Sequence, residues 1–283
     1  MKPAAFDYVA PPTVEQAVAA LAAGDGDARI LAGGQSLVPA MNARLARPAL
    51  LIDINRIAGL DAITIDAGQL AVGALVRHHK MAMSPAVAAA SPLLARAAMA
   101  IGHDAIRRRG TVCGSLAHAD PAAQWPMMAC LFDAELVAQG PGDRRRIAAR
   151  DFFRGIFETS LASDEMLVEV RFAQPDPDER GALRWTWRRH GDFVTGAVAL
   201  RLVRDAGGRV AKLRAVAGGF AAAPVDLSAV LAPALGTAPD PARIGALASG
   251  AVFEPLSDLR ASAAYRRDLL PVLVARAVED AIA

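Results

Sequence analysis

Two short glycine-containing segments hold the residue types that could bind a charged ligand. The first, from Leu31 to Leu37, reads Leu-Ala-Gly-Gly-Gln-Ser-Leu and follows a short apolar stretch. The second, from Arg109 to Leu116, reads Arg-Gly-Thr-Val-Cys-Gly-Ser-Leu and lies about eighty residues further along. Glycine adopts positive φ readily and has no Cβ, so successive backbone N–H groups in such a turn can surround an anion. The pair of segments therefore predicts a site for two phosphates.

The other polar residues form neither a metal site nor a catalytic set. Cys113 and Cys130 are the only cysteines, whereas an iron–sulfur cluster normally takes roughly four. His118 and Asp120 would share one face of an extended segment, but a metal ion needs a further ligand nearby. The histidine pair at 78–79 points apart on any regular element, and we expect both at the surface. We therefore expect no metal ion and no catalytic acid, base or nucleophile in this chain.

Overall composition argues against nucleic-acid-binding, membrane-spanning and secreted proteins. The 283 residues include 31 Lys and Arg and 29 Asp and Glu, a net charge of only +2, whereas nucleic-acid binding normally needs a clustered basic face. The longest uncharged stretch, 81–95, is shorter than the roughly 20 residues of a membrane span and contains two prolines. With no apolar signal-peptide core and so few cysteines, a reduced cytoplasmic setting is expected.

Flanking patterns predict how the two glycine segments are held. Residues 29–32 have the pattern of a buried strand that leads into the first segment. Ser36 is placed to cap an apolar helix that begins at Leu37, and such a helix would point the positive end of its dipole at the loop. The arginine triplet 107–109 directly precedes the second segment, where it either attracts an anion or is simply solvated.

Strand and helix patterns divide the chain into three parts and predict the α+β class. Residues 1–55 combine a capping-box helix after Pro12 with short apolar strands, and residues 56–174 alternate short apolar runs with Ala-rich helical stretches. The segment from Pro175 to Gly181 is a boundary, because its prolines and charges block strands and helices. Residues 182–283 continue with helical sequence after three long antiparallel strands, expected at 182–189, 194–204 and 209–217.

Four motifs occur in a fixed order along the chain: Ala32-Gly33-Gly34-Gln35-Ser36-Leu37, Asp53-Ile54-Asn55, Thr111-Val112-Cys113-Gly114-Ser115 and Ala117-His118-Ala119-Asp120-Pro121. Together with Arg188 to Phe193 and Tyr265 to Arg267, they closely resemble the FAD-binding medium subunit of the molybdenum hydroxylases. This is the family of xanthine dehydrogenase and carbon monoxide dehydrogenase. One glycine pair alone would be a weak signal, whereas four ordered motifs at matching spacing are specific. The resemblance covers essentially the whole chain.

The resemblance implies a fold and a cofactor. The family has a two-lobed FAD-binding domain of the PCMH or vanillyl-alcohol-oxidase type, followed by a three-stranded antiparallel sheet with a helical bundle. Residues 1–55 would then be the N-terminal lobe, 56–174 the second lobe and 182–283 the C-terminal flavoprotein domain. FAD would lie in the cleft between the lobes, with one glycine segment on each side.

The resemblance also implies partner subunits. A large subunit would oxidise substrate at a molybdenum cofactor, and a small subunit would relay electrons through two [2Fe–2S] clusters. This chain would hold the FAD that passes the electrons to an external acceptor, in a dimer of heterotrimers. The flavin would carry the redox chemistry and the protein would position it. A mean hydropathy of +0.28 fits an apolar surface covered by such partners.

Position by position, the resemblance implies which residues contact FAD. Both glycine segments would hold the diphosphate and ribityl chain, and Ile101 would pack near the flavin or adenine. Leu167 and Arg184 match family positions near the isoalloxazine, and Asp120 either contacts FAD or caps the helix after Pro121. The implied cofactor-binding residues are Leu31, Ala32, Gly33, Gly34, Gln35, Ser36, Leu37, Ile101, Thr111, Cys113, Gly114, Ser115, Asp120, Gln124, Leu167 and Arg184.

Two positions depart from the family pattern. The second segment of the family usually reads Thr-Ile-Gly-Gly, and Cys113 replaces its first glycine. If that position needs positive φ, the cysteine is strained by roughly 1–3 kcal/mol. Gln124 stands where the family commonly has an acidic residue that binds a ribose hydroxyl, and its amide oxygen accepts a hydrogen bond without adding charge. Both departures bear on the affinity for FAD.

Two further function classes stay open at this point. A self-contained flavin oxidoreductase of the same fold would need a substrate domain with polar catalytic groups or a covalent flavin anchor, and the C-terminal part offers little of either. A non-catalytic nucleotide-binding scaffold subunit would be favoured if Cys113 and Gln124 abolished FAD binding while the complex still assembled. The sequence names neither the substrate of the complex nor the terminal electron acceptor.

Overall fold

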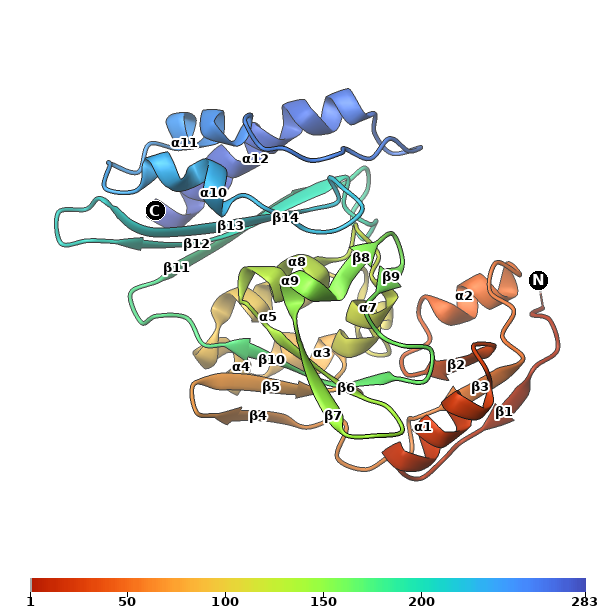
Figure 1. Ribbon diagram of the computed structural model, residues 1–283. Helices are drawn as coiled ribbons and strands as arrows, with labels where there is room; N and C mark the ends of the chain where they lie inside the picture. The colour runs from red at the N-terminus through yellow and green to blue at the C-terminus, as the bar shows by residue number, and fades with distance from the viewer. Residues whose placement is uncertain (1) are drawn as a thin grey trace.

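The computed structural model describes residues 2–283, which form three main β-sheets in order along the chain. In Figure 1 the N-terminal sheet, in red and orange, lies to one side of a yellow and green central body. The blue C-terminal layer covers the top of that body. Within residues 2–283, no helix combines the length and the apolar character of a membrane span.

The N-terminal sheet has three parallel strands in the order β1-β3-β2. Its elements are β1 Asp7–Val9, α1 Val14–Ala23, β2 Ala28–Leu31, α2 Leu37–Asn42 and β3 Leu50–Asp53. The capping-box helix is confirmed, because the Thr13 side chain accepts a hydrogen bond from the backbone N–H of Gln16. Strand β2 ends at Leu31, where the first glycine segment begins, so the sheet holds that segment at one edge of the central body.

The central sheet has five antiparallel strands in the order β4-β5-β10-β6-β7. The elements of this part are β4 Ile63–Asp66, β5 Gln69–Gly73, α3 His78–Met83, α4 Pro85–Ala90, α5 Pro92–Met99, α6 Asp104–Arg107, α7 Val112–His118, α8 Gln124–Leu131, β6 Glu135–Gln139, β7 Arg144–Ala148, α9 Ala149–Phe152, β8 Phe153–Gly155, β9 Glu158–Thr159 and β10 Met166–Ala173. One continuous hydrophobic core joins this sheet to its helices and to the N-terminal sheet. The N-terminal sheet is therefore packed firmly against the central body.

The C-terminal sheet has four antiparallel strands in the order β11-β12-β13-β14. Its elements are β11 Arg180–Thr186, β12 Gly196–Arg204, β13 Val210–Gly218, β14 Val225–Asp226, α10 Ser228–Leu231, the 3-10 helix η1 Ala232–Ala234, α11 Pro241–Ala248 and α12 Ala263–Ile282. The prediction of three strands was wrong by one, because β14 is only two residues long. A pattern of alternating apolar and polar residues cannot show in so short a strand.

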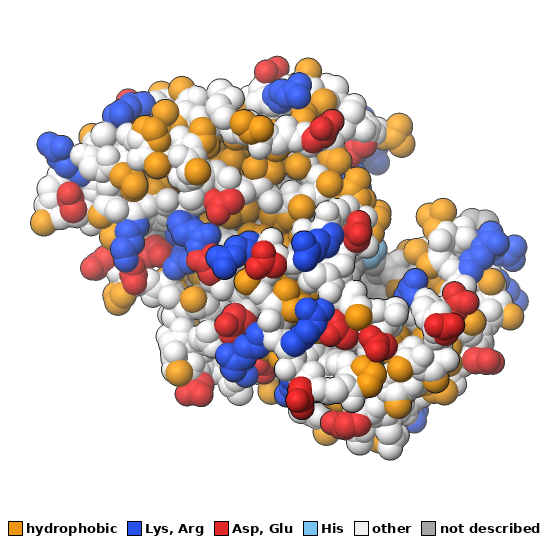
Figure 2. Space-filling model, in the orientation of Figure 1, with side chains coloured by type: hydrophobic (Ala, Val, Ile, Leu, Met, Phe, Trp, Pro, Cys, Tyr) orange, Lys and Arg blue, Asp and Glu red, His pale blue; other side chains and the backbone are white. Residues whose placement is uncertain are grey.

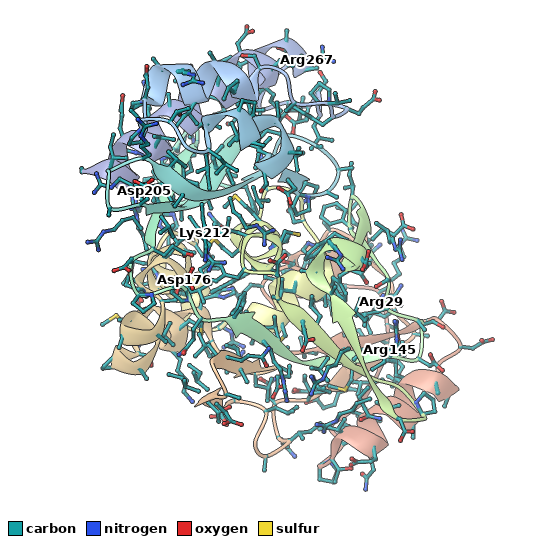
Figure 3. All side chains as sticks on the ribbon, turned by 60° about the vertical axis from the view of Figure 1, so that its left-hand side comes forward. Arg29, Arg145, Asp176, Asp205, Lys212 and Arg267 are labelled. Atoms are coloured by element: carbon teal, nitrogen blue, oxygen red, sulfur yellow. The ribbon has the colours of Figure 1, made fainter. Side chains whose placement is uncertain are left out.

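The C-terminal sheet separates two hydrophobic cores. Successive residues of β12 face opposite sides: Ala199 joins the core of the central body, and Leu200 joins a second core under α11 and α12. The boundary segment, Pro175 to Gly181, is linked to this sheet by an exposed ion pair of 2.6 Å between Asp176 and Lys212. Both residues are labelled in Figure 3. Strand β11 of this sheet also packs against helix α5 of the central body.

A buried arginine holds the C-terminal layer together. Arg266, on α12, is only 2% exposed. Its guanidinium donates to four backbone carbonyl oxygens and one carboxylate, those of Thr195, Gly219, Leu256, Ala261 and Asp258. A buried charge is tolerated when its donors are satisfied in this way. The contacts explain the first arginine of the Tyr265-Arg266-Arg267 motif.

Replacing Arg266 by Met should lower the free energy of unfolding by about 3–5 kcal/mol, because it leaves buried carbonyl oxygens without their donor. Urea unfolding followed by circular dichroism measures the effect. The control is Arg267→Met, since Arg267 is exposed and labelled at the surface in Figure 3. That change should cost less than about 0.5 kcal/mol. Equal effects of the two substitutions would show that the Arg266 contacts do not stabilise the fold.

Candidate functional site

A cleft of about 580 Å³ lies between the N-terminal sheet and the central body. Figure 2 shows the molecular surface hollowed between these two parts. The cleft is lined by the end of β2, the start of α2 and the end of β3, together with the residue before α3 and the two residues after α6. The lining residues are Leu31, Ala32, Gly33, Gly34, Gln35, Val38, Pro39, Asp53, Asn55, Arg77, Arg108 and Arg109.

Gly33 brings the two glycine segments into direct contact. A Cβ at this position would lie 2.3 Å from the carbonyl oxygen of Arg109 and 2.7 Å from the Cα of Gly110. Both are backbone atoms and cannot swing aside as a flexible side chain would. Gly34 has a φ of 70°, which glycine adopts without strain. The first segment is thus the glycine turn that its composition predicted, and it packs against the start of the second segment.

The first segment leaves a row of backbone donors available. Within residues 2–283, the backbone N–H groups of Gly33, Gly34, Gln35 and Ser36 donate no hydrogen bond to the chain. Ser36 directly precedes α2, as predicted, but its side chain does not cap the helix because its backbone is already helical rather than extended. Free donors beside a glycine turn can bind an anion such as a phosphate.

The second segment is a helix start and not a glycine turn. Thr111 caps α7, since its Oγ1 accepts from the backbone N–H of Gly114 at 3.0 Å. A Cβ on Gly114 would lie 2.5 Å from that Oγ1, so the cap requires a small residue there. The prediction of a second small-residue turn was therefore wrong. The Thr-x-x-Gly spacing serves the helix cap.

The strain considered for Cys113 is absent. Cys113 lies in the first turn of α7 with helical backbone, and it is not among the described residues with positive φ. Its Sγ lies 3.6 Å from the carbonyl oxygen of Val72, towards the central sheet. Burial raises the pKa of the thiol, so Cys113 stays protonated and unreactive. Its side chain is part of the core below the cleft.

Arg77 connects the two sides of the cleft. Its guanidinium donates to Asn55 Oδ1 at 2.5 Å and to the backbone carbonyl oxygen of Arg109. Asn55 in turn donates to the carbonyl oxygen of Ala32 at 2.9 Å and to Asp53 Oδ1 at 2.6 Å. This chain of hydrogen bonds runs from the first glycine segment to the second. The separation of the two segments is therefore set by side chains as well as by the contact at Gly33.

Positive charge exceeds negative charge in the cleft. Arg77, Arg108 and Arg109 line it, against the single carboxylate of Asp53. Burial and the neighbouring charge of Arg109 lower the pKa of the Arg77 guanidinium. Burial acts to raise the pKa of Asp53, but hydrogen bonds from its neighbours outweigh it and lower the pKa, so Asp53 stays ionised. The excess positive charge suits a ligand with more than one negative charge.

The second segment rests on a buried, neutral histidine. His78 is 4% exposed, its Nδ1 accepts from the indole N–H of Trp125 at 3.0 Å, and its backbone N–H donates to the carbonyl oxygen of Gly110. Burial, with smaller effects of the Arg77 and Arg107 charges, lowers the pKa of His78 to about 3. The predicted surface position was therefore wrong for His78. This residue is buried and binds the backbone of Gly110, in the second segment.

Five of the predicted site residues line the cleft, namely Leu31, Ala32, Gly33, Gly34 and Gln35. The other eleven lie outside its lining: Ser36, Leu37, Ile101, Thr111, Cys113, Gly114, Ser115, Asp120, Gln124, Leu167 and Arg184. Asn55 and Asp53 line it and belong to a motif that carried the family resemblance, although no site role was predicted for them. Arg77 was missed altogether, because nothing in the local sequence distinguishes it from a solvated arginine.

Three of the residues outside the lining have well-defined surroundings. Asp120 accepts a hydrogen bond from the backbone N–H of Ala122, so it stabilises the turn after Pro121. Gln124 begins α8 with 8% exposure, and its side-chain amide makes no hydrogen bond within residues 2–283. Arg184 pairs with Asp280 of α12 at 2.5 Å. Arg184 therefore faces the C-terminal helices and not the cleft.

Comparison with known families agrees with this geometry. Residues 4–175 match the family described as the FAD binding domain in molybdopterin dehydrogenase, and residues 182–281 match the CO dehydrogenase flavoprotein C-terminal domain. The chain belongs to the FAD-binding medium subunits of the molybdopterin dehydrogenases. It is thus a flavoprotein-type subunit of oxidoreductase complexes, and the resemblance found in the motifs is confirmed.

Individual members of the family cover almost the whole chain. The 6-hydroxypseudooxynicotine dehydrogenase complex subunit alpha of Paenarthrobacter nicotinovorans is 37% identical over 100% of this chain and 96% of its own length. The carbon monoxide dehydrogenase medium chain of Hydrogenophaga pseudoflava is 35% identical over 99% and 98%. The structure of quinoline 2-oxidoreductase from Pseudomonas putida 86 matches with a TM-score of 0.94 at 33% identity, over 100% of this chain and 98% of that one.

The burial of His78 predicts a loss of stability in mild acid. Its pKa is about 3 in the folded chain, whereas an unfolded histidine titrates near 6.5, so the unfolded state binds more protons between these values. The contribution of His78 to the free energy of unfolding should be fully present above about pH 6.5 and should be lost as the pH falls towards 3. The His78→Gln variant should take up about one proton fewer on unfolding near pH 4–5. The dependence of the thermal unfolding midpoint on pH measures this number.

The control for this pH profile is Val252→Gln, because Val252 is exposed and neither side chain titrates. That substitution should leave the slope of the profile unchanged. A His78→Gln variant with the same slope as the unsubstituted chain would mean that burial does not hold His78 neutral.

Proposed function

We propose that this chain holds FAD and transfers electrons in a heterotrimeric molybdenum hydroxylase. Electrons would arrive from the [2Fe–2S] clusters of a small partner subunit and leave to an external acceptor. A large partner subunit would carry the molybdenum cofactor and oxidise the substrate, and the assembly would be a dimer of heterotrimers. Relatives named as subunits of dehydrogenase complexes, such as the carbon monoxide dehydrogenase medium chain, support this proposal.

The contact between Gly33 and the Arg109–Gly110 backbone is the observation that carries the proposal. The free N–H groups of residues 33–35 and the three arginines line one cleft of about 580 Å³, and Arg108 is also paired with Asp104. Backbone donors and guanidinium groups are the partners that a diphosphate requires. Gln124 stays a proposal as the residue that accepts a hydrogen bond from a ribose hydroxyl, although it lies outside the lining of this cleft. The residues present therefore fit a dinucleotide flavin.

Each part of the cleft then has a role towards that cofactor. The N–H groups of residues 33–35 would bind one phosphate, and Arg109 would neutralise the other, since Arg108 is already paired with Asp104. Arg77 and Asn55 would hold the two phosphate-binding segments at a constant separation. When bound, FAD would supply redox chemistry that accepts and releases one or two electrons. No side chain of this chain needs to act as acid, base or nucleophile in that transfer.

We further propose the domain division that the sequence suggested. Residues 1–55 and 56–174 would be the two lobes of a PCMH-type FAD-binding domain, and residues 182–283 the C-terminal flavoprotein domain. Ile101, Leu167 and Arg184 stay proposals as neighbours of the flavin. For Arg184 this requires a change of partner, because the side chain is paired with Asp280 in this structure.

Gly33→Ala should weaken FAD binding by at least about tenfold, because its Cβ would meet the Arg109 carbonyl oxygen at 2.3 Å and separate the two segments. Titration of the flavin-free chain with FAD, followed by flavin fluorescence, measures the dissociation constant. Gly142→Ala is the matched control, since a Cβ there meets nothing within 4 Å and the residue has no positive φ. Unchanged affinity in Gly33→Ala, with normal circular dichroism, would contradict the proposed role of the contact.

The isolated chain should bind FAD and yet oxidise no organic substrate. The reason is that the cleft offers no catalytic acid, base or nucleophile and that substrate oxidation is assigned to the large subunit. Incubation of the FAD-loaded chain with aldehydes, purines and N-heterocycles, followed anaerobically by flavin absorbance, tests this. Bleaching of the flavin by any of them, in the absence of partner subunits, would favour a self-contained flavin oxidoreductase instead.

A further inference from the structure

Asp53 stands where a strand of the N-terminal sheet opens onto the proposed FAD cleft. Strand β2, helix α2 and strand β3 form a strand–helix–strand unit in which the two strands run parallel. Leu31, the last residue of β2, pairs in register with Asp53, the last residue of β3. Ligands of such parallel units bind outside the carboxyl ends of the strands. Asp53 is therefore placed beside the first glycine segment, and it lines the cleft.

Three hydrogen bonds hold the Asp53 carboxylate in one orientation. Its Oδ2 accepts from the hydroxyl of Tyr8 at 2.7 Å, and this contact is exposed to solvent. Its Oδ1 accepts from the backbone N–H of Asn55 at 2.8 Å and from the side-chain amide of Asn55 at 2.6 Å. An ionised carboxylate has about four lone-pair sites. Within residues 2–283 no other group donates to it, so one acceptor site on Oδ2 is left for a ligand.

Such a carboxylate selects a ligand group that donates. It can only accept hydrogen bonds, and its charge repels a phosphate. The diphosphate of a dinucleotide would therefore lie at the glycine segment and Arg109, and a neighbouring hydroxyl would face Asp53. A hydroxyl that donates to an ionised acceptor forms a short, strong hydrogen bond. Among the described residues that line the cleft, Asp53 has the only carboxylate for such a bond.

The spacing along the chain points to a ribose hydroxyl. In dinucleotide-binding proteins, a strand, a glycine turn, a helix and a second strand lead to an acidic residue about twenty residues after the turn, and that residue binds a ribose hydroxyl. Asp53 stands at this spacing from Gly34, at the end of β3. Only this unit is shared, since residues 31–37 lack the three spaced glycines of that class.

We propose that Asp53 accepts a hydrogen bond from a ribose hydroxyl in the adenosine half of the cofactor and thereby selects for that half. The inference rests on the proposed function, in which FAD is the ligand. Asn55 would hold the carboxylate in place through its two bonds to Oδ1. Gln124 lies outside the lining of the cleft, so it would accept from a different hydroxyl.

Titration of the flavin-free chain with FAD and with its 2′-deoxyadenosine and 3′-deoxyadenosine analogues, followed by flavin fluorescence, tests this contact. One analogue should bind about tenfold more weakly than FAD, because it lacks a hydrogen bond to a charged acceptor. In Asp53→Asn this ratio of dissociation constants should fall to about twofold or less, because a neutral amide accepts more weakly. A purely structural role of Asp53 would weaken the binding of FAD and both analogues equally. An unchanged ratio in Asp53→Asn would therefore overturn the proposal.

Two further variants serve as controls. Tyr8→Phe keeps the carboxylate and its two bonds to Asn55, so the ratio should stay within about twofold of that of the unsubstituted chain. Asp66→Asn removes an exposed carboxylate at the end of β4, outside the cleft lining, and should change neither the ratio nor the affinity for FAD. A ratio that falls in either control as far as in Asp53→Asn would overturn the proposal.

The unsubstituted chain gives a test that needs no variant, so it stands even if Asp53→Asn does not fold. Equal binding of FAD and both analogues by this chain would overturn the inference and leave the proposed function intact. No binding of FAD would contradict the proposed function itself. The two failures are therefore distinguishable.

Discussion

The close approach of Gly33 to the backbone of Arg109 and Gly110 is the constraint on which the rest of the structure depends. Two segments about eighty residues apart in sequence meet there with no side chain between them. The N-terminal sheet presents one segment, and the cap of α7 by Thr111 holds the other. A continuous hydrophobic core under both keeps this arrangement rigid. The cleft is consequently formed before any ligand arrives, which lowers the entropic cost of binding.

Charge is distributed so that the only carboxylate lining the cleft, that of Asp53, is already hydrogen-bonded. Arg77 donates only to neutral oxygens, and Asp53 is already engaged by hydrogen bonds from its neighbours. Below the second segment, His78 is held neutral by burial and accepts from Trp125, so it adds no further positive charge. The positive charges that face a ligand are therefore those of the arginines that line the cleft. Folding has placed them together at a cost that a bound dianion would offset.

The sequence predicted local features well and contacts between distant segments poorly. The glycine turn at 33–34, the helix capped by Thr13 and the long strands of the C-terminal sheet follow from residue types and periodicity over a few positions. The role of Arg77 and the burial of His78 depend on partners far along the chain, and no local pattern reports them. Gly114 illustrates the limit, because a glycine beside a hydroxyl residue indicates an anion loop or a capped helix equally well. The structure decides for the cap, since Thr111 Oγ1 accepts from the Gly114 N–H. The edge strand β14 is too short to have any pattern.

The central claim is that two abutting segments form one site for a diphosphate. Its most direct measurement is the ratio of dissociation constants of the purified, flavin-free chain for FAD and for FMN, which carries a single phosphate and no adenosine. If the backbone donors of residues 33–35 and the arginines that line the same cleft each bind a phosphate, FAD should bind at least about 100-fold more tightly, as expected from two charge-assisted contacts. Equal affinities for FAD and FMN, or no binding of either, would contradict the account.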